Sequence, residues 1–252
     1  MQQEATQDRA ARLGKAAGPV PGAVGGVALL LPSGEEHSTR RPSPLAATAL
    51  RPLARRLTRA GRDEGLVTHA VHYRGRGWNG AQAELVRDAR WAADEVVRRY
   101  GDVPVCLVGV GMGARAALHA AGHTAVNSVL ALAPWLPEDD VAAPPEPVKQ
   151  LAGRHVLIVH GTDDRRTDPE LSFRLAGRAK KANRDVCRFE VHSDGHALHQ
   201  HRSEVAALAV DFTLGTLFAR PFSRPLRDAL AAPPPIGLRM PLAAGFGRTL
   251  PR

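Results

Sequence analysis

Residues 105–118 read VCLVGVGMGARAAL, and this stretch decides the fold. An apolar run ending at Val110 meets three closely spaced glycines and then continues with the apolar spacing of an amphipathic helix. Glycines at such a junction allow a tight turn, because they adopt backbone angles that other residues avoid. The stretch therefore predicts a buried strand that passes through a sharp turn directly into a helix.

The same alternation of apolar strand and helix recurs along the chain. The runs typical of buried strands are Gly26–Leu31, Leu66–Tyr73, Val103–Val110, Ser128–Leu132, His155–His160 and Val186–His192. The stretches typical of helices are Pro44–Ala60, Ala81–Tyr100, Met112–Ala121, Pro169–Ala182 and Ser203–Phe218. Continuous apolar strands that alternate with helices indicate a parallel sheet covered on both faces. We therefore expect one α/β domain over residues 25–220, with a doubly wound, mostly parallel sheet.

Two known motifs can be compared with the glycine turn. A dinucleotide-binding loop needs Gly-x-Gly-x-x-Gly near the first strand and an acidic residue about 20 positions later. Here Gly113 comes one residue too early, and the following strand ends in Ala131-Leu132-Ala133 without an acidic side chain. The spacing fits better the Gly-x-Ser-x-Gly nucleophile elbow, in which a sharp turn lifts a serine above the sheet.

The elbow makes the chain resemble a compact α/β-hydrolase of the dienelactone hydrolase or carboxylesterase kind. The resemblance covers Gly26–Phe218, and the elbow matches at Gly109, Met112 and Gly113. Gly111 stands where the family has its serine nucleophile. The resemblance implies a fold without a lid domain, and an ancestor that hydrolysed acyl compounds.

Two later motifs match the acid and the base of that family. A His-Gly-x-x-Asp sequence follows the predicted strand at His155–His160 and puts Asp164 at the position of the family's triad carboxylate. The sequence Ser-Asp-Gly-His after the last predicted strand puts His196 at the position of the general base. Elbow, acid and base then occur in the chain order that this fold requires.

Each of these motifs also has a simpler interpretation. Asp163, Asp164 and Asp168 precede the helix predicted from Pro169, where aspartates often cap the first turn. Histidines at short spacing can share a metal ion, and four occur here: His192, His196, His199 and His201. No carboxylate or cysteine motif accompanies them, so we expect neither a metal site nor a cofactor.

Gly111 changes what the site is expected to do. Without an Oγ at this position no acyl-enzyme can form there, and in a comparable triad enzyme that loss costs about a millionfold in turnover. What remains is a pocket that accepts an anion, formed by the Met112 backbone N–H and the loop with Ser33 and Gly34. We therefore expect a non-catalytic protein that binds a small acyl or ester-like ligand.

A residual hydrolase is the alternative to that binding protein. In it, His196 and Asp164 would activate a water molecule in the space left by the serine. Ser33, Ser193 and Cys106 lie on other segments, and none is expected to replace the nucleophile.

Net charge adds a third class of function, a nucleic-acid-associated basic protein. The chain has 34 Lys and Arg against 25 Asp and Glu, a net charge of +9, which is typical of proteins with anionic partners. Four arginines recur along one side of the first predicted helix, namely Arg51, Arg55, Arg59 and Arg62. Aromatic residues make up only 4% of the chain, and no nucleic-acid-binding module is recognisable, so we expect a solvated arginine face.

The cysteines and the chain ends complete the predictions. Cys106 and Cys187 lie in apolar runs, which predicts reduced thiols and a cytoplasmic protein. The sequence contains neither a signal peptide pattern nor an apolar run long enough to span a bilayer. We expect residues 1–24 to be flexible. Residues 221–252 contain seven prolines and carry a net charge of +4, which predicts an extended, disordered tail.

Overall fold

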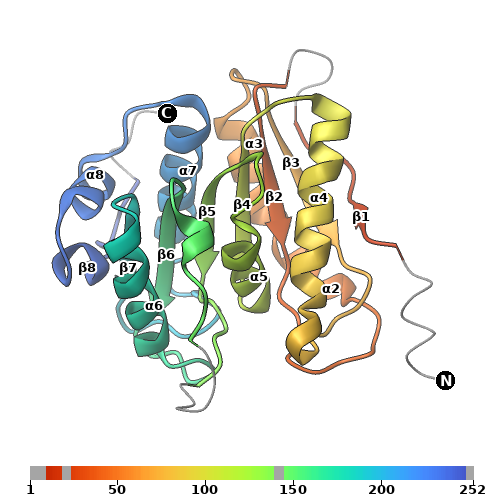
Figure 1. Cartoon of the computed structure of the whole chain (residues 1–252). Helices are drawn as coiled ribbons and strands as arrows, with labels where there is room; N and C mark the ends of the chain where they lie inside the picture. Colours follow the sequence, from red (N-terminus) through yellow and green to blue (C-terminus); the bar gives the residue numbers. More distant parts are fainter. Residues whose placement is uncertain (1–9, 19–23, 139–144, 248–252) are drawn as a thin grey trace.

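A computed structural model describes residues 10–18, 24–138 and 145–247. Its eight-stranded sheet has the order β1-β3-β2-β4-β5-β6-β7-β8 (Figure 1). The strands are β1 Arg12–Leu13, β2 Gly26–Leu31, β3 Leu66–His72, β4 Val105–Val110, β5 Val126–Leu132, β6 His155–Gly161, β7 Val186–Val191 and β8 Met240–Pro241. β1 is antiparallel to β3, and every other neighbouring pair is parallel.

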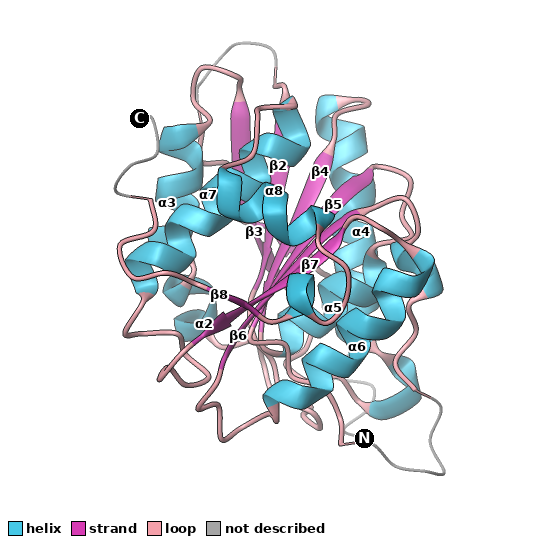
Figure 2. Ribbon diagram, turned by 90° about the vertical axis from the view of Figure 1, so that its left-hand side faces the viewer, coloured by secondary structure: helices cyan, strands magenta, loops and turns pink. Residues whose placement is uncertain are grey.

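Helices cover both faces of the sheet, as Figure 2 shows. One face carries α4 Glu84–Tyr100, α5 Met112–Ala120 and α6 Pro169–Ala182. The other carries α3 Arg51–Ala60, α7 Arg202–Phe218 and α8 Arg224–Ala231, with the short α2 Pro44–Ala49 before α3. Alternate residues of β2 enter different cores: Leu29 packs with the first group of helices and Leu30 with the second. This double burial explains why the strands read as continuous apolar runs.

The predicted strands and helices are present, with shifts at their ends. The helix predicted over Pro44–Ala60 is divided at Leu50 into α2 and α3, and Pro52 lies in the first turn of the second helix. Proline has no backbone N–H, so it is tolerated in a first turn but not within a helix. The helix predicted from Ala81 begins at Glu84, because Ala83 has a left-handed backbone (φ +43°) and a short 3₁₀ turn, Gly80–Gln82, precedes it.

The structure contradicts the prediction of a disordered tail for residues 221–247, the part of this segment that it describes. Leu226 and Ala229 of α8 are buried in the core, and Met240 of β8 pairs with Phe189 of β7. A 3₁₀ turn, Ile236–Leu238, connects the two elements and is also partly buried. The proline-rich composition suggested disorder, but a few well-placed apolar residues are enough to dock the segment on the sheet.

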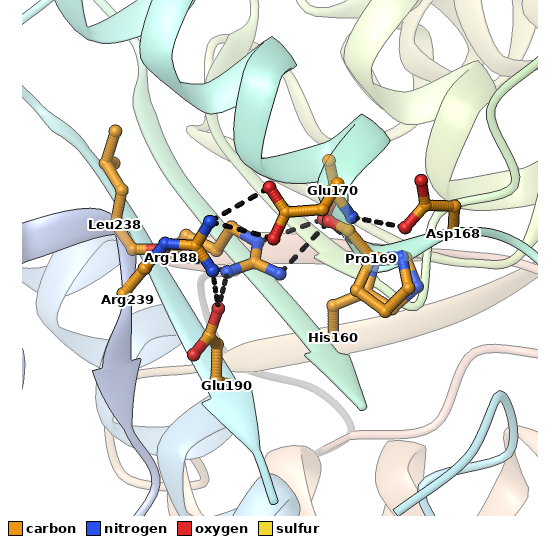
Figure 3. Close-up of polar contacts among 9 residues, drawn as sticks. His160, Asp168, Pro169, Glu170, Arg188, Glu190, Leu238 and Arg239 are labelled. Carbon is orange, nitrogen blue, oxygen red and sulfur yellow. Dashed lines mark hydrogen bonds and ion pairs between the residues drawn. The ribbon is translucent and has the colours of Figure 1, made fainter. Parts of the chain in front are cut away.

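Figure 3 shows how polar contacts hold that segment in place. The fully buried Arg188 of β7 donates from Nη1 to the Leu238 carbonyl oxygen at 3.0 Å and to Glu190 at 2.7 Å. Arg239 also reaches Glu190, at 3.2 Å, and pairs with Glu170 of α6 at 2.8 Å. The C-terminal segment is thus tied to both β7 and α6.

The prediction that residues 1–24 are flexible is likewise wrong for residues 10–18. Arg12 and Leu13 pair with β3, and Ala17 forms a β-bridge with Thr68. The segment therefore extends the sheet beyond β3. Across the described residues, no helix has both the length and the apolarity needed to cross a membrane.

Candidate active site

The turn between β4 and α5 has the close packing that its glycines predict. A Cβ at Gly109 would collide with the Gly113 carbonyl oxygen, and a Cβ at Gly113 would collide with the Leu31 carbonyl oxygen. Gly111 lies between them at φ +56°, in the region that favours glycine. The sharp strand-to-helix turn is therefore formed, and position 111 stands at its tip.

Two side chains from distant loops face the space above Gly111. A Cβ built there would lie 2.5 Å from Ser33 Oγ and 3.4 Å from His196 Nε2. The Met112 backbone N–H donates to the same Ser33 hydroxyl at 3.4 Å. Ser33 therefore fills part of the space that a side chain at position 111 would occupy.

Asp164 and His196 come together as the chain order predicts. Asp164 follows β6, His196 follows β7, and His196 Nδ1 lies 2.8 Å from Asp164 Oδ2. The carboxylate is fully buried, whereas the imidazole is 16% exposed. The backbone N–H groups of Arg166 and Thr167 donate to the other carboxylate oxygen at 2.8 and 3.2 Å.

The hydrogen bonds around Asp164 determine its charge. Burial alone would raise the pKa of Asp164, but hydrogen bonds from His160, His196 and the Arg166 N–H hold that pKa well below its usual range. The carboxylate is therefore ionised at neutral pH. It accepts the Nδ1–H of His196, which leaves the Nε2 lone pair directed toward the space above Gly111.

His160 is a second imidazole on Asp164, and the sequence interpretation assigned it no role. Its Nε2 lies 3.0 Å from Asp164 Oδ2, and its Nδ1 lies 2.9 Å from Ser172 Oγ. Burial lowers the pKa of His160, so the ring is neutral at neutral pH and its one proton serves the carboxylate. Arg188 donates to the same Ser172 hydroxyl at 2.9 Å. The sequence signal that could have identified this contact was a histidine at the end of β6, four residues before Asp164.

The remaining candidates have other partners. Asp168 caps α6 by accepting from the Glu170 N–H at 2.9 Å, so the capping interpretation holds for Asp168, whereas Asp164 lies at the candidate site. Gly34 packs against the Arg76 carbonyl oxygen, where a Cβ would lie at 2.6 Å, and only its neighbour Ser33 meets the Met112 N–H.

The histidines and cysteines also have local explanations. His201 lies 3.4 Å from Asp194, and His199 lies 2.7 Å from Arg202. Within residues 10–18, 24–138 and 145–247, no three His, Cys, Asp or Glu side chains form a metal-binding group. Burial raises the pKa of Cys106 to about 11 and that of Cys187 to about 12, so both free thiols stay protonated at neutral pH.

Comparisons with known proteins identify the fold. No protein-family model matches the chain, and no curated protein matches it. An esterase from Pyrococcus furiosus superposes with a TM-score of 0.62 at 15% identity, covering 77% of this chain and 82% of that one. The esterase Est1E from Butyrivibrio proteoclasticus, solved with ferulic acid bound, has a TM-score of 0.59 at 14% identity over 83% and 96%. A Xanthomonas campestris protein described as an α/β serine hydrolase without a lid has a TM-score of 0.55 at 18% identity over 84% and 89%. The predicted α/β-hydrolase fold is confirmed.

Proposed function

We propose that this chain with the α/β-hydrolase fold hydrolyses a small carboxylic ester or a related acyl compound, with Ser33 as the nucleophile. The sequence alone favoured a non-catalytic binding protein, because Gly111 has no Oγ and Ser33 was expected to contribute to the anion-accepting pocket rather than to replace the nucleophile. The observation that carries the proposal is the convergence of Ser33 Oγ and His196 Nε2 on the one side-chain position that Gly111 leaves empty.

The protonation state of the site supports this assignment. Asp164 is ionised and holds His196 by Nδ1, so the imidazole presents Nε2 as the proton acceptor. Ser33 carries the hydroxyl that faces this region, and it lies on the loop after β2 rather than on the elbow. Ser33 would thus take the role that the elbow serine has in the resembled family, and His196 would keep the role of the base.

The proposed reaction has two steps that balance. Ser33 Oγ forms a bond to the acyl carbon while its proton moves to His196 Nε2, and the alcohol then leaves with that proton as the carbon–oxygen bond breaks. Water attacks the acyl-enzyme, gives a proton to Nε2 and releases the carboxylic acid, and the proton returns to Ser33. The Met112 N–H, freed from the Ser33 hydroxyl, would donate to the negative oxygen of each tetrahedral intermediate.

The test follows hydrolysis of short-chain activated esters by wild type, Ser33→Ala and His196→Ala. We expect each substitution to lower turnover by at least about 100-fold, the lower end of what a positioned base contributes. Ser193→Gly is the matched control, because Ser193 lies three residues before His196 and already has a left-handed backbone (φ +57°). Its turnover should equal that of wild type.

Covalent labelling separates the competing outcomes. A serine-directed phosphonate should modify the peptide that contains Ser33, and mass spectrometry locates the adduct. If Ser33→Ala keeps its activity while His196→Ala loses it, the nucleophile is water activated by His196 and Asp164. If wild type turns over no ester and takes no label, the protein is the non-catalytic ligand-binding protein that the sequence favoured.

A further inference from the structure

A second recessed site lies beside the candidate active site. It is a cleft of about 810 Å³ between the N-terminal segment 10–17, the outer part of the sheet at β3, and helices α2 and α3. Its floor is largely apolar and includes Leu30, Leu50, Ala54 and Ala70. This volume falls in the usual range of small-molecule sites, about 300–1,000 Å³.

The charge of the cleft has a single sign. Six basic side chains contribute to its lining, namely Arg12, Lys15, Arg41, Arg51, Arg55 and Arg74, and the lining contains no Asp or Glu. Arg74 is neutralised by the buried Asp88, at 2.6 Å. In the part of the chain that the structure describes, none of the other five forms an ion pair. Five cations gathered around one hollow repel each other and raise the local concentration of anions.

The cations come from elements that only the fold brings together. Arg12 and Lys15 belong to the segment that pairs with β3, while Arg51 and Arg55 lie one turn apart on α3. His72 of β3 lies among them. Burial lowers the pKa of His72, and the charge of Arg12 lowers it further, so this imidazole is neutral at neutral pH and adds a hydrogen-bonding group without further charge.

The cleft also leads toward the candidate nucleophile. A narrow hollow lined by Pro32 and Ser33 shares with the cleft the residues Pro42, Ser43, Ala47, His72 and Tyr73. The Tyr73 hydroxyl donates to the Pro32 carbonyl oxygen at 3.2 Å and so fixes the wall between the two spaces. One end of the cleft therefore adjoins the hollow at Ser33.

We infer that the cleft binds a small organic phosphate, with an apolar body on the floor and its phosphate groups among Arg12, Lys15, Arg41, Arg51 and Arg55. Guanidinium groups match phosphate oxygens with paired hydrogen bonds, and several cations suit a ligand with more than one negative charge. The cleft lies beside Ser33, so the substrate would be an acyl ester that carries phosphate groups. This identification of the substrate rests on the proposed function.

The binding test uses calorimetry with inorganic pyrophosphate and with ADP, and adenosine is the uncharged comparison. Arg51→Gln/Arg55→Gln should weaken binding of both anions by at least about tenfold, because the variant loses two guanidinium groups that can form charge-assisted hydrogen bonds to phosphate. Arg56→Gln/Arg59→Gln removes the same charge from the same helix, outside the cleft lining, and should change affinity less than twofold. Adenosine should bind more weakly than ADP.

Equal weakening by the two double variants would overturn the inference, since it would show general attraction to a basic surface. Absence of pyrophosphate and ADP binding to wild type at physiological salt would overturn it as well. His196→Ala should keep full binding, because His196 does not line the cleft. Its failure to hydrolyse esters therefore tests the proposed function separately.

The link to the substrate has its own measurement. We compare a short activated ester with the same ester bearing a phosphonate on its acyl chain. Arg51→Gln/Arg55→Gln should raise KM for the phosphonate ester more than KM for the uncharged ester, and Arg56→Gln/Arg59→Gln should leave both KM values unchanged. Suppose that Arg51→Gln/Arg55→Gln loses pyrophosphate binding but has the same change in KM for both esters. The cleft then binds free phosphates, and the inference that it binds the phosphate groups of the substrate is wrong.

Discussion

At the scale of single residues, the main feature is the space above Gly111. The missing side chain leaves room for Ser33 Oγ, 2.5 Å from the position of a Cβ, and His196 Nε2 faces the same point at 3.4 Å. Because Gly111 has φ +56°, any other residue there is strained by about 1–3 kcal/mol. A serine restored at position 111 therefore meets both backbone strain and the Ser33 hydroxyl.

Moving the hydroxyl back to the elbow tests this geometry. In Gly111→Ser alone, the new Cβ would lie 2.5 Å from Ser33 Oγ and 3.2 Å from Ser33 Cβ, so we expect lowered thermal stability and little labelling. Gly111→Ser/Ser33→Gly removes that clash. It should take a phosphonate label at residue 111, as mapped by peptide mass spectrometry. Equal labelling of residue 111 in the single and the double variant would contradict the predicted clash between a side chain at position 111 and Ser33.

The charge of Asp164 leads to a prediction about pH. Its pKa is lowered in the folded state, so its stabilising contribution is present above the unfolded-state value, about 3.9, and is lost as pH falls below it toward the lower folded-state pKa. Urea unfolding of wild type and Asp164→Asn between pH 6 and pH 3 gives the difference in the free energy of unfolding. That difference should shrink as the pH falls below about 4. A constant difference would mean that folding does not lower the pKa of Asp164.

His160 leads to a prediction about positioning. His160→Phe removes one of the two imidazole hydrogen bonds to Asp164, so we expect a loss of about 1–3 kcal/mol in the free energy of unfolding. If the proposed function holds, turnover should also fall, because His160 helps to hold the carboxylate that orients His196. A loss of stability with unchanged turnover would limit His160 to a structural role.

At the scale of elements, the C-terminal segment is the main departure from the sequence prediction. Helix α8 and strand β8 are held by two kinds of contact: apolar burial of Leu226 and Leu238, and the polar contacts of Arg188 and Arg239 seen in Figure 3. Arg188 is the largest fully buried side chain in the described chain, and it links β7, α6 and the C-terminal segment.

Replacing Arg188 tests how that element is held. Arg188→Met leaves the Leu238 carbonyl oxygen without this donor and leaves Glu190 with Arg239 alone, and breaking such a buried pair costs about 3–5 kcal/mol. Arg184→Met, at an exposed position just before β7, should cost less than about 0.5 kcal/mol. Urea unfolding measures both. Similar losses in the two variants would show that the buried contacts of Arg188 contribute little.

At the scale of the whole molecule, the excess positive charge is unevenly spread. The net charge of +9 includes five cations around one cleft that lacks carboxylates. A ligand that binds the folded state stabilises it by about 2.7 kcal/mol at 100 times its Kd. Pyrophosphate should therefore raise the Tm of wild type, less so at high salt because ions screen the attraction. Arg51→Gln/Arg55→Gln should make the rise smaller, and Arg56→Gln/Arg59→Gln should keep it.

The sequence by itself determined the strands, the helices and the elbow. Apolar runs such as Gly26–Leu31 and glycine spacing such as Gly109 to Gly113 are local signals, because burial on both faces and tight turns restrict neighbouring residues directly. The order of elbow, Asp164 and His196 followed from motifs at strand ends, and the structure brings these segments to one edge of the sheet.

Only the tertiary structure decided which distant side chains share a space. Ser33 meets Met112, 79 positions along the chain, because β2 and β4 are neighbours in the sheet although β3 lies between them in sequence. The cleft joins Arg12 to α3 in the same way, and apolar burial docks the proline-rich C-terminal segment on β7. Such contacts depend on sheet order and packing, which composition and local periodicity do not contain.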